Sequence, residues 1–173
     1  VESVAKPTAE NTNQKKASDL YNTGRERFDN GDASGAVELY VQSLKLEPHS
    51  SGAQLSLGHA YLKLQKDRDA IKAFKEAIKL NPNVAESHYG LGYCNFRLAR
   101  FREAADAFKK AIEYNPQMAQ AYYQLGISYF GQPTTIPEAI PTLEKFQSLV
   151  AAMPKEEQAS YANDVEASKQ LIE

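Results

Sequence analysis

The chain has 173 residues, of which 24% are charged and 42% hydrophobic, a length that supports one ordinary domain with its own core. Its net charge of −2 and pI near 6.0 exclude the basic surface of a nucleic-acid-binding protein, and its single cysteine excludes an internal disulfide. No run of about 20 apolar residues occurs, so we expect no membrane insertion by this chain. Because it begins with Val1, an anchor or signal upstream would lie outside it, and cytoplasmic and membrane-tethered locations both stay open.

Residues 1–16 are polar, contain no aromatic side chain and show no periodicity. This composition is typical of segments that bury too little apolar surface to fold. We therefore predict a flexible linker or tail over residues 1–16 and a folded domain over residues 17–173.

The stretch after this tail repeats with a period of about 34 residues, and a fixed period of this length indicates a repeat architecture. Glycine, alanine, aromatic and proline positions all recur with that step. They are Gly24, Gly58, Gly92 and Gly126; Ala36, Ala70 and Ala104; Tyr40, Phe74 and Phe108; and Pro48, Pro82 and Pro116. The pattern predicts helix pairs over 17–30 and 33–46, 51–64 and 67–80, and 85–98 and 101–114. A proline follows each second helix, because the residue before proline resists the α region.

A fourth unit, from 119 to about 153, departs from the pattern by one inserted residue and lacks the closing proline. The turn between its helices reads GQPTTIPEAIP, which is longer and richer in proline than the other turns. We expect Pro137 near the first turn of the second helix and Pro141 to kink the start of that helix. A last helix over about 155–172 has only a thin apolar stripe, and we expect it to cap the array.

The order of these anchors, Leu-Gly, then Ala-x-x-x-Phe, then Pro, resembles the tetratricopeptide repeat (TPR). The resemblance covers 17–50, 51–84, 85–118 and, with its insertion, 119–153. It implies an all-α, right-handed superhelix of antiparallel helix pairs with a C-terminal capping helix. Gly92 would then lie where the two helices cross, beside Ala104 and Phe108. Burial of a large side chain there, about 1.5–3 kcal/mol, outweighs the roughly 1 kcal/mol cost of a glycine in a helix.

Gly90 lies in the same predicted helix but does not recur. We expect it on the exposed groove side of the helix. There it either lets a ligand backbone come close or is simply tolerated on a solvated face.

Side chains that carry chemistry are sparse. The three histidines, His49, His59 and His88, show no metal-ligand spacing with Cys94. An isolated histidine is usually a core or edge residue, and Cys94 occupies a small-residue position of the repeat. No glycine-rich phosphate loop occurs, because the glycines lie within helices. We therefore predict no catalytic residue, no metal site and no cofactor, and the chain is not expected to be an enzyme.

In the family that this sequence resembles, the first helices of the pairs line a concave groove that binds partner proteins. The resemblance implies the following groove residues: Tyr21, Arg25, Leu55, His59, Lys63, Tyr89, Tyr93, Arg97, Tyr123 and Ile127. Tyrosine is enriched at recognition surfaces, because it combines a large apolar ring with a polar tip. We expect a non-catalytic adaptor or scaffold whose groove takes a peptide or helical segment. The basic groove positions favour a partner with apolar anchors and at least one acidic residue.

One family subtype does not fit. Chaperone-binding members hold the C-terminal carboxylate of heat-shock chaperones with a clamp of lysine, arginine and asparagine. The corresponding positions in this chain are Tyr21, Arg25, Ser56, Glu86 and Gly90, or, one repeat later, Leu55, His59, Gly90, Gln120 and Gln124. Neither set builds a clamp, so we expect no chaperone C-terminus as partner.

Two other roles stay open: a self-assembling scaffold that forms homo-oligomers, and the targeting domain of a larger enzyme. From Tyr114 to Pro137 the sequence contains no charged residue. Loss of charge beside aromatic residues is typical of interface cores. We therefore expect a second contact there, with a partner or with another copy of the chain.

Overall fold

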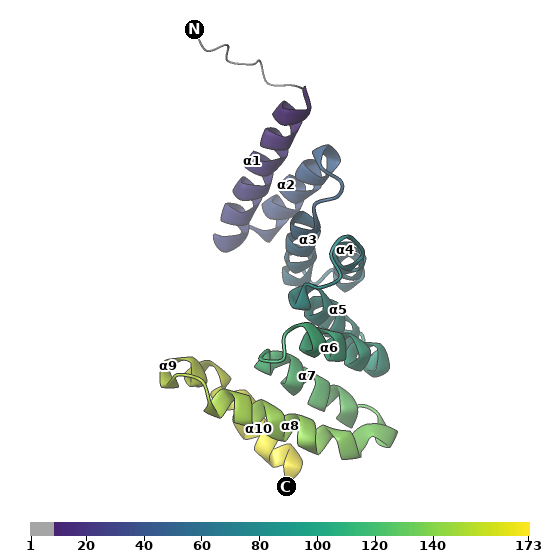
Figure 1. The fold of residues 1–173 in the computed structure, drawn as a ribbon, viewed down its shortest axis with the longest axis vertical. Coiled ribbons are helices and arrows are strands. Elements are labelled where there is room, and N and C mark those ends of the chain that lie inside the picture. Colours follow the sequence, from purple (N-terminus) through teal and green to yellow (C-terminus); the bar gives the residue numbers. More distant parts are fainter. Residues whose placement is uncertain (1–8) are drawn as a thin grey trace. The chain divides into compact units, whose positions relative to one another are not determined.

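The computed structural model describes residues 9–173, which are helical apart from short connections (Figure 1). Helix α1 spans Ala9–Asp29 and so begins before the expected start at residue 17. Residues 9–16, expected as part of a linker, are therefore helical. They contain no glycine or proline, and Glu10 lies in the first turn, where an acidic side chain favours the helix dipole. The side chains of residues 10–16 are exposed, which explains the missing periodicity. The remaining part of the expected tail lies outside the described residues.

The chain forms two compact units, the first ending at Pro82 and the second beginning at Asn83. The first unit contains α1, α2 (Ala33–Leu46), α3 (Ser51–Lys63) and α4 (Asp67–Leu80). The second contains α5 (Ala85–Arg97), α6 (Phe101–Tyr114), α7 (Ala119–Phe130), η1 (Pro133–Thr135), α8 (Ile136–Ala151), α9 (Lys155–Gln158), η2 (Ala159–Tyr161) and α10 (Ala162–Ile172). The described residues include no β-strand. The all-α fold of consecutive helix pairs is confirmed: α1 packs on α2, α3 on α4, α5 on α6 and α7 on α8.

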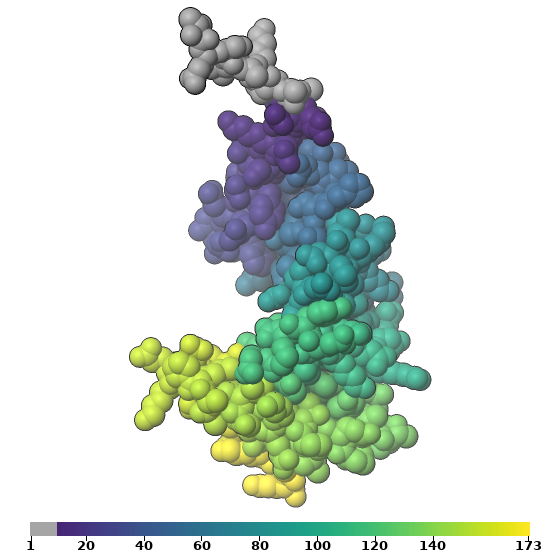
Figure 2. All heavy atoms as spheres, viewed as in Figure 1, coloured from purple at the N-terminus to yellow at the C-terminus, as the bar shows by residue number. Residues whose placement is uncertain are grey.

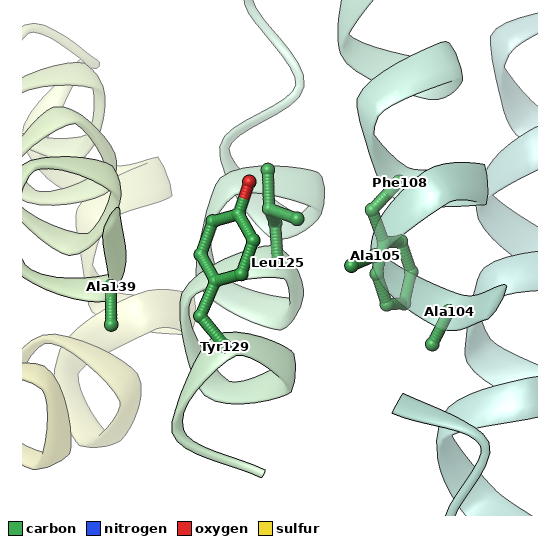
Figure 3. Close-up of a cluster of buried hydrophobic side chains, with 6 residues drawn as sticks. All are labelled: Ala104, Ala105, Phe108, Leu125, Tyr129 and Ala139. Carbon is green, nitrogen blue, oxygen red and sulfur yellow. The ribbon is translucent and has the colours of Figure 1, made fainter. Parts of the chain in front are cut away.

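The recurring glycines are packing residues, as predicted. A Cβ atom added to Gly92 would lie 2.7 Å from the Phe108 ring, and one added to Gly58 would lie 2.6 Å from the Phe74 ring. Both rings are fully buried. Any side chain at these glycines would push the two helices of the pair apart. In the second unit this packing continues across α7, where Leu125 and Tyr129 lie between α6 and α8 (Figure 3).

The turn between the helices of a pair has the same form three times. Gly31, Gln65 and Ala99, each one repeat after the other, have φ angles of 88°, 58° and 56°. Each donates a backbone hydrogen bond to the residue three before it, and the next residue donates to the carbonyl five before it, as in Ala99 N to Phe96 O and Arg100 N to Asn95 O. This is the Schellman ending of a helix, which needs a residue in the left-handed region.

The next residue in this series is Pro133, whose ring holds φ at a negative value and excludes the left-handed region. The fourth connection therefore takes another form, the short helix η1. It is shorter than we expected, because α8 already begins at Ile136. Pro137 stands in the first turn of α8, as predicted, and Pro141 lies inside the helix.

The exposed position expected for Gly90 is wrong, because Gly90 is buried in α5. Its place in the helix could not be read from the repeat, since the equivalent residues of the other repeats are polar and larger.

After α8 the chain turns back through α9 and η2 into α10. The atoms of α10 (yellow) lie against those of α8 (yellow-green) in Figure 2. Gln147 Nε2 donates a hydrogen bond to the buried Ser168 Oγ at 2.9 Å, and the rings of Phe146 and Tyr161 meet edge to face with centroids 6.1 Å apart. The C-terminal segment is therefore fixed to the last helix pair through both polar and aromatic contacts.

Candidate protein-binding faces

In the first unit, the residues implied by the repeat pattern lie on α1 and α3. Tyr21 of α1 reaches α3, where its hydroxyl is 3.3 Å from Ser56 Oγ. Its ring lies 5.7 Å from the ring of Tyr40, a side chain that is 1% exposed. Burial raises the pKa of Tyr40, so its phenol stays neutral. Tyr21 is half-buried and thus rests on the core with part of its surface open. We call the surface of Tyr21, Arg25, Leu55, His59 and Lys63 the first face.

The other members of the first face differ in how much they offer to a partner. Leu55 and His59 are half-buried on α3, while Arg25 and Lys63 are exposed. The His59 ring meets the Phe74 ring edge to face at 5.2 Å, so much of its surface contacts the repeat core. The side chains that the first face offers most openly to a partner are therefore Tyr21, Leu55 and the two exposed cations, Arg25 and Lys63.

In the second unit, Tyr89 and Tyr93 of α5 lie one turn apart with nearly parallel rings, centroids 6.3 Å apart at 18°. The Tyr89 ring also contacts that of the buried Phe108 at 5.6 Å. Both tyrosines are half-buried, and Arg97 is exposed in the last turn of α5. The stacked pair is therefore held from beneath by the core while part of each ring remains open.

Tyr123 and Ile127 of α7 are also half-buried. The Tyr123 ring packs on Phe146 of α8 with centroids 5.1 Å apart, and the Asp164 carboxylate of α10 adds to burial in raising the pKa of its phenol. The Tyr161 ring packs on the same Phe146, and the Gln120 side chain of α7 acts on its pKa in the lowering direction. The C-terminal segment thus adds Tyr161 and Asp164 to the surface formed by α5 and α7. We call the surface of Tyr89, Tyr93, Tyr123, Tyr161 and Asp164 the second face.

The tyrosine hydroxyls of the second face share an electrostatic environment. Burial raises the pKa of Tyr89 to about 12, and the neighbouring Tyr93, Asp164 and Tyr161 contribute in the same direction. Burial and the Asp164 carboxylate also raise the pKa of Tyr123 and Tyr161. One carboxylate therefore acts on three tyrosines that come from α5, α7 and η2.

Sequence reasoning missed Asp164 as a site residue and named Tyr161 only as part of an apolar stripe. Both follow the last repeat, where the repeat period no longer assigns positions to a face. The one available signal was the tyrosine itself, in a helix otherwise poor in large apolar residues.

Two of the side chains considered for chemistry lie in the core. Cys94 is fully buried, and His88 is 8% exposed with its ring stacked on Tyr114 at 5.3 Å. Within residues 9–173, no group of three or more His, Cys, Asp or Glu side chains is placed to hold a metal ion. None of the helices in the same range has the length and apolar character to cross a bilayer.

Comparison with protein families agrees with the repeat geometry. Two models of the tetratricopeptide repeat match residues 21–67 and 85–118, and a TPR repeat model matches residues 58–98. Together these matches span more than half of the chain. The chain belongs to the tetratricopeptide repeat family. No curated protein sequence matches it.

Several solved structures share the TPR fold of this chain. A crystal structure of a MamA protein is 27% identical, covers 90% of this chain and 93% of its own, and has a TM-score of 0.72. MamA from Desulfovibrio magneticus RS-1, from residue 41 to the end, is 20% identical over 90% of each chain, with a TM-score of 0.75. The first TPR of Spaghetti (RPAP3), bound to the HSP90 peptide SRMEEVD, is 23% identical over 66% of this chain and 91% of its own, with a TM-score of 0.65. The fold is thus that of a protein–protein interaction module.

Proposed function

We propose that this TPR domain binds a peptide or helical segment of a partner protein on the tyrosine-bearing faces of its first helices, and acts as an adaptor or scaffold in complex assembly. The observation that carries the proposal is the stacked pair of Tyr89 and Tyr93, supported by Phe108 and still partly open. Large aromatic rings fixed by a core lose little conformational freedom on binding, and they are frequent among the residues that dominate interface energies.

The alternative role for these tyrosines is purely internal packing. Phe108 and its partners already fill the space between α5 and α6, where the buried rings lie. Tyr89 and Tyr93 both pack against the core cluster that contains Phe108, yet both remain only half-buried. Internal packing leaves part of each ring open to a partner, so we favour recognition over a role in packing alone.

The first face favours a partner segment with apolar anchors and an acidic residue. Arg25 and Lys63 are exposed on α1 and α3, the helices that also carry Tyr21 and Leu55. A carboxylate of the partner gains charge-assisted hydrogen bonds from either cation, and the apolar anchors cover the half-buried Tyr21 and Leu55 side chains. The RPAP3 domain was solved with a peptide, which supports a peptide as the kind of ligand.

A chaperone C-terminus is not the partner we propose. Glu86, at a clamp position, is exposed on α5 and would repel a carboxylate, while Gly90, at another, is buried and offers no cation. A nucleic acid is also disfavoured by the net charge of −2.

The test is a double substitution, Tyr89→Ala with Tyr93→Ala, in the intact chain. Affinity capture with the wild-type domain first supplies a partner, whose affinity is then measured by calorimetry. We expect the double variant to bind at least about 30-fold more weakly, which corresponds to about 2 kcal/mol and is typical of hot-spot residues. Circular dichroism must show retained helicity, because Tyr89 also packs on Phe108.

Tyr114→Ala is the matched control, since Tyr114 is a 37% exposed tyrosine on the second helix of the same pair. It should leave partner affinity within about twofold. Unchanged affinity in a folded double variant would overturn the proposed function. Two other roles, self-assembly and targeting of an enzyme encoded beyond this chain, are distinguished by light scattering and by the full reading frame.

A further inference from the structure

The second face holds a carboxylate without a cationic partner. Asp164 of α10 is half-buried, and its carboxylate raises the pKa of the Tyr123 phenol. Among residues 9–173, no lysine or arginine forms a salt bridge with Asp164, whereas Glu166 on the same helix lies 3.9 Å from Lys169. Asp164 lies in the first turn of α10, where the helix dipole stabilises a carboxylate, so this half-buried negative charge is retained and can attract a cation.

Aromatic rings surround this carboxylate. Tyr123 and Tyr161 both pack against Phe146, with centroids 5.1 and 6.1 Å from it, so the two tyrosines flank one buried ring. The stacked Tyr89 and Tyr93 stand on α5, the neighbouring first helix of the same unit, and Asp164 and Tyr161 both act on the Tyr89 hydroxyl. Three half-buried tyrosines, Tyr89, Tyr123 and Tyr161, therefore lie within the electrostatic influence of one carboxylate.

We propose that Tyr89, Tyr123, Tyr161 and Asp164 form a binding site for an arginine side chain of the partner protein. A guanidinium donates up to five hydrogen bonds in a fixed plane and stacks on aromatic faces. The carboxylate and the phenol oxygens provide acceptors, and the tyrosine rings provide stacking surfaces with a cation–π contribution. The inference rests on the proposed protein-binding role. It adds that the partner segment at the second face carries a positive charge.

A competing role for Asp164 is to fix the C-terminal segment through Tyr123. The two roles predict different effects of removing its charge. Asp164→Asn keeps an oxygen that can accept from the Tyr123 hydroxyl, so a purely structural residue should tolerate it. An arginine site should lose affinity, because the charge that attracts the guanidinium is gone.

The experiment uses two tripeptides as probes, acetyl-Gly-Arg-Gly-amide and its citrulline counterpart, which has the same shape but no charge. The intact chain is labelled with ¹³C-tyrosine, and tyrosine-to-phenylalanine variants assign the resonances. We expect saturable shifts of the Tyr89, Tyr123 and Tyr161 resonances with the arginine peptide, with Kd of the order of 1 mM, and at least about fivefold weaker binding of the citrulline peptide.

Asp164→Asn should weaken binding of the arginine peptide at least fivefold, while Glu166→Gln, an equal charge change two residues along α10, should leave it within twofold. Equal binding of the two peptides to wild type would overturn the inference, and this arm does not depend on any variant folding. Equal binding of the arginine peptide to wild type and Asp164→Asn would overturn it as well. If the arginine site fails while Tyr89→Ala with Tyr93→Ala still weakens the natural partner, the proposed function stands and only the arginine assignment falls.

Discussion

At the scale of single residues, three equivalent turn positions have positive φ, but only Gly31 is a glycine. Gln65 and Ala99 adopt the same left-handed conformation at a cost of roughly 1–2 kcal/mol each. Both residues adopt this conformation because the backbone hydrogen bonds of the Schellman turn require it.

Two glycine-to-alanine substitutions should therefore change the free energy of unfolding in opposite directions. Gly31→Ala adds a Cβ that meets nothing within 4 Å but forces alanine to a φ of 88°, so we expect a loss of about 1 kcal/mol in the free energy of unfolding. Gly52→Ala lies in α3, where the added Cβ would be 3.9 Å from the Tyr21 hydroxyl, and we expect a gain of about 0.5–1 kcal/mol. Urea denaturation of both variants measures the difference. Two changes of the same sign would contradict this account.

The tyrosine hydroxyls of the second face also predict a pH dependence. The folded state raises the pKa of Tyr89 to about 12 from its ordinary value of 10, so the folded chain holds that proton more tightly than the unfolded chain. The corresponding stability is fully present below pH 10 and is lost as the pH rises from 10 to about 12. Chemical denaturation across this range should show a steeper fall for wild type than for Tyr89→Phe. Identical slopes would mean that the Tyr89 phenol titrates as an exposed one.

At the scale of helices, the second helices of the first three pairs begin with nearly the same backbone geometry but different side chains. Asp32 caps α2 by accepting from Gly35 N at 2.8 Å, and with Arg27 nearby its pKa is held below the ordinary value. Arg100, at the start of α6, has φ −90° and ψ 68°, close to the −82° and 72° of Asp32, yet makes no side-chain cap.

Arg100→Ser should therefore add a missing cap. The serine hydroxyl would accept from the N–H of the third helical residue, Glu103, which has no side-chain cap at present. We expect thermal and urea denaturation to show a gain of about 0.5–2 kcal/mol. Arg102→Ser, inside the first turn of α6, serves as control and should be neutral or slightly destabilising. A gain in the control but not in Arg100→Ser would contradict the capping argument.

At the scale of the whole molecule, exposed apolar side chains lie at the end of the charge-free stretch and just beyond it. Ile136, inside the stretch, is 42% exposed, and Ile140, one turn further along α8 and past Glu138, is 37% exposed. Gln124, in contrast, has a buried side-chain oxygen and so is not a free surface residue. The two exposed isoleucines are therefore the side chains best suited to the second contact expected from the sequence.

A double substitution, Ile136→Glu with Ile140→Lys, tests whether this end of the second unit associates with another copy. The two charges form a favourable i,i+4 pair, so the fold should change by less than about 0.5 kcal/mol. If the contact exists, light scattering and sizing of the variant should show a smaller species than wild type at the same concentration. Leu171→Lys, at a 41% exposed site on α10, is the matched control. Wild-type and variant chains of equal size would leave these isoleucines without a role in self-association.

The sequence by itself determined the helix pairs, because the residues that pack the two helices of a pair together belong to the same repeat. Gly92 and Phe108 meet across a single turn, so the repeat period already implies their contact. The sequence also indicated that the fourth turn differs from the others, because Pro133 occupies the position that has a positive φ in the first three turns. The groove positions of Tyr89, Tyr93 and Tyr123 were implied by the resemblance to the repeat family, and their role in binding stays a prediction.

Only the tertiary structure decided the features that the period does not reach. The extra turns of α1 are exposed and hence have no hydrophobic pattern, and Gly90 is buried although no equivalent glycine recurs in the other repeats. Asp164 joins Tyr89 and Tyr123 because α8, α9 and η2 carry the chain back, through the contacts of Phe146 and Ser168. Proximity between residues so far apart in sequence arises from the packing of whole helices, and no local spacing encodes it.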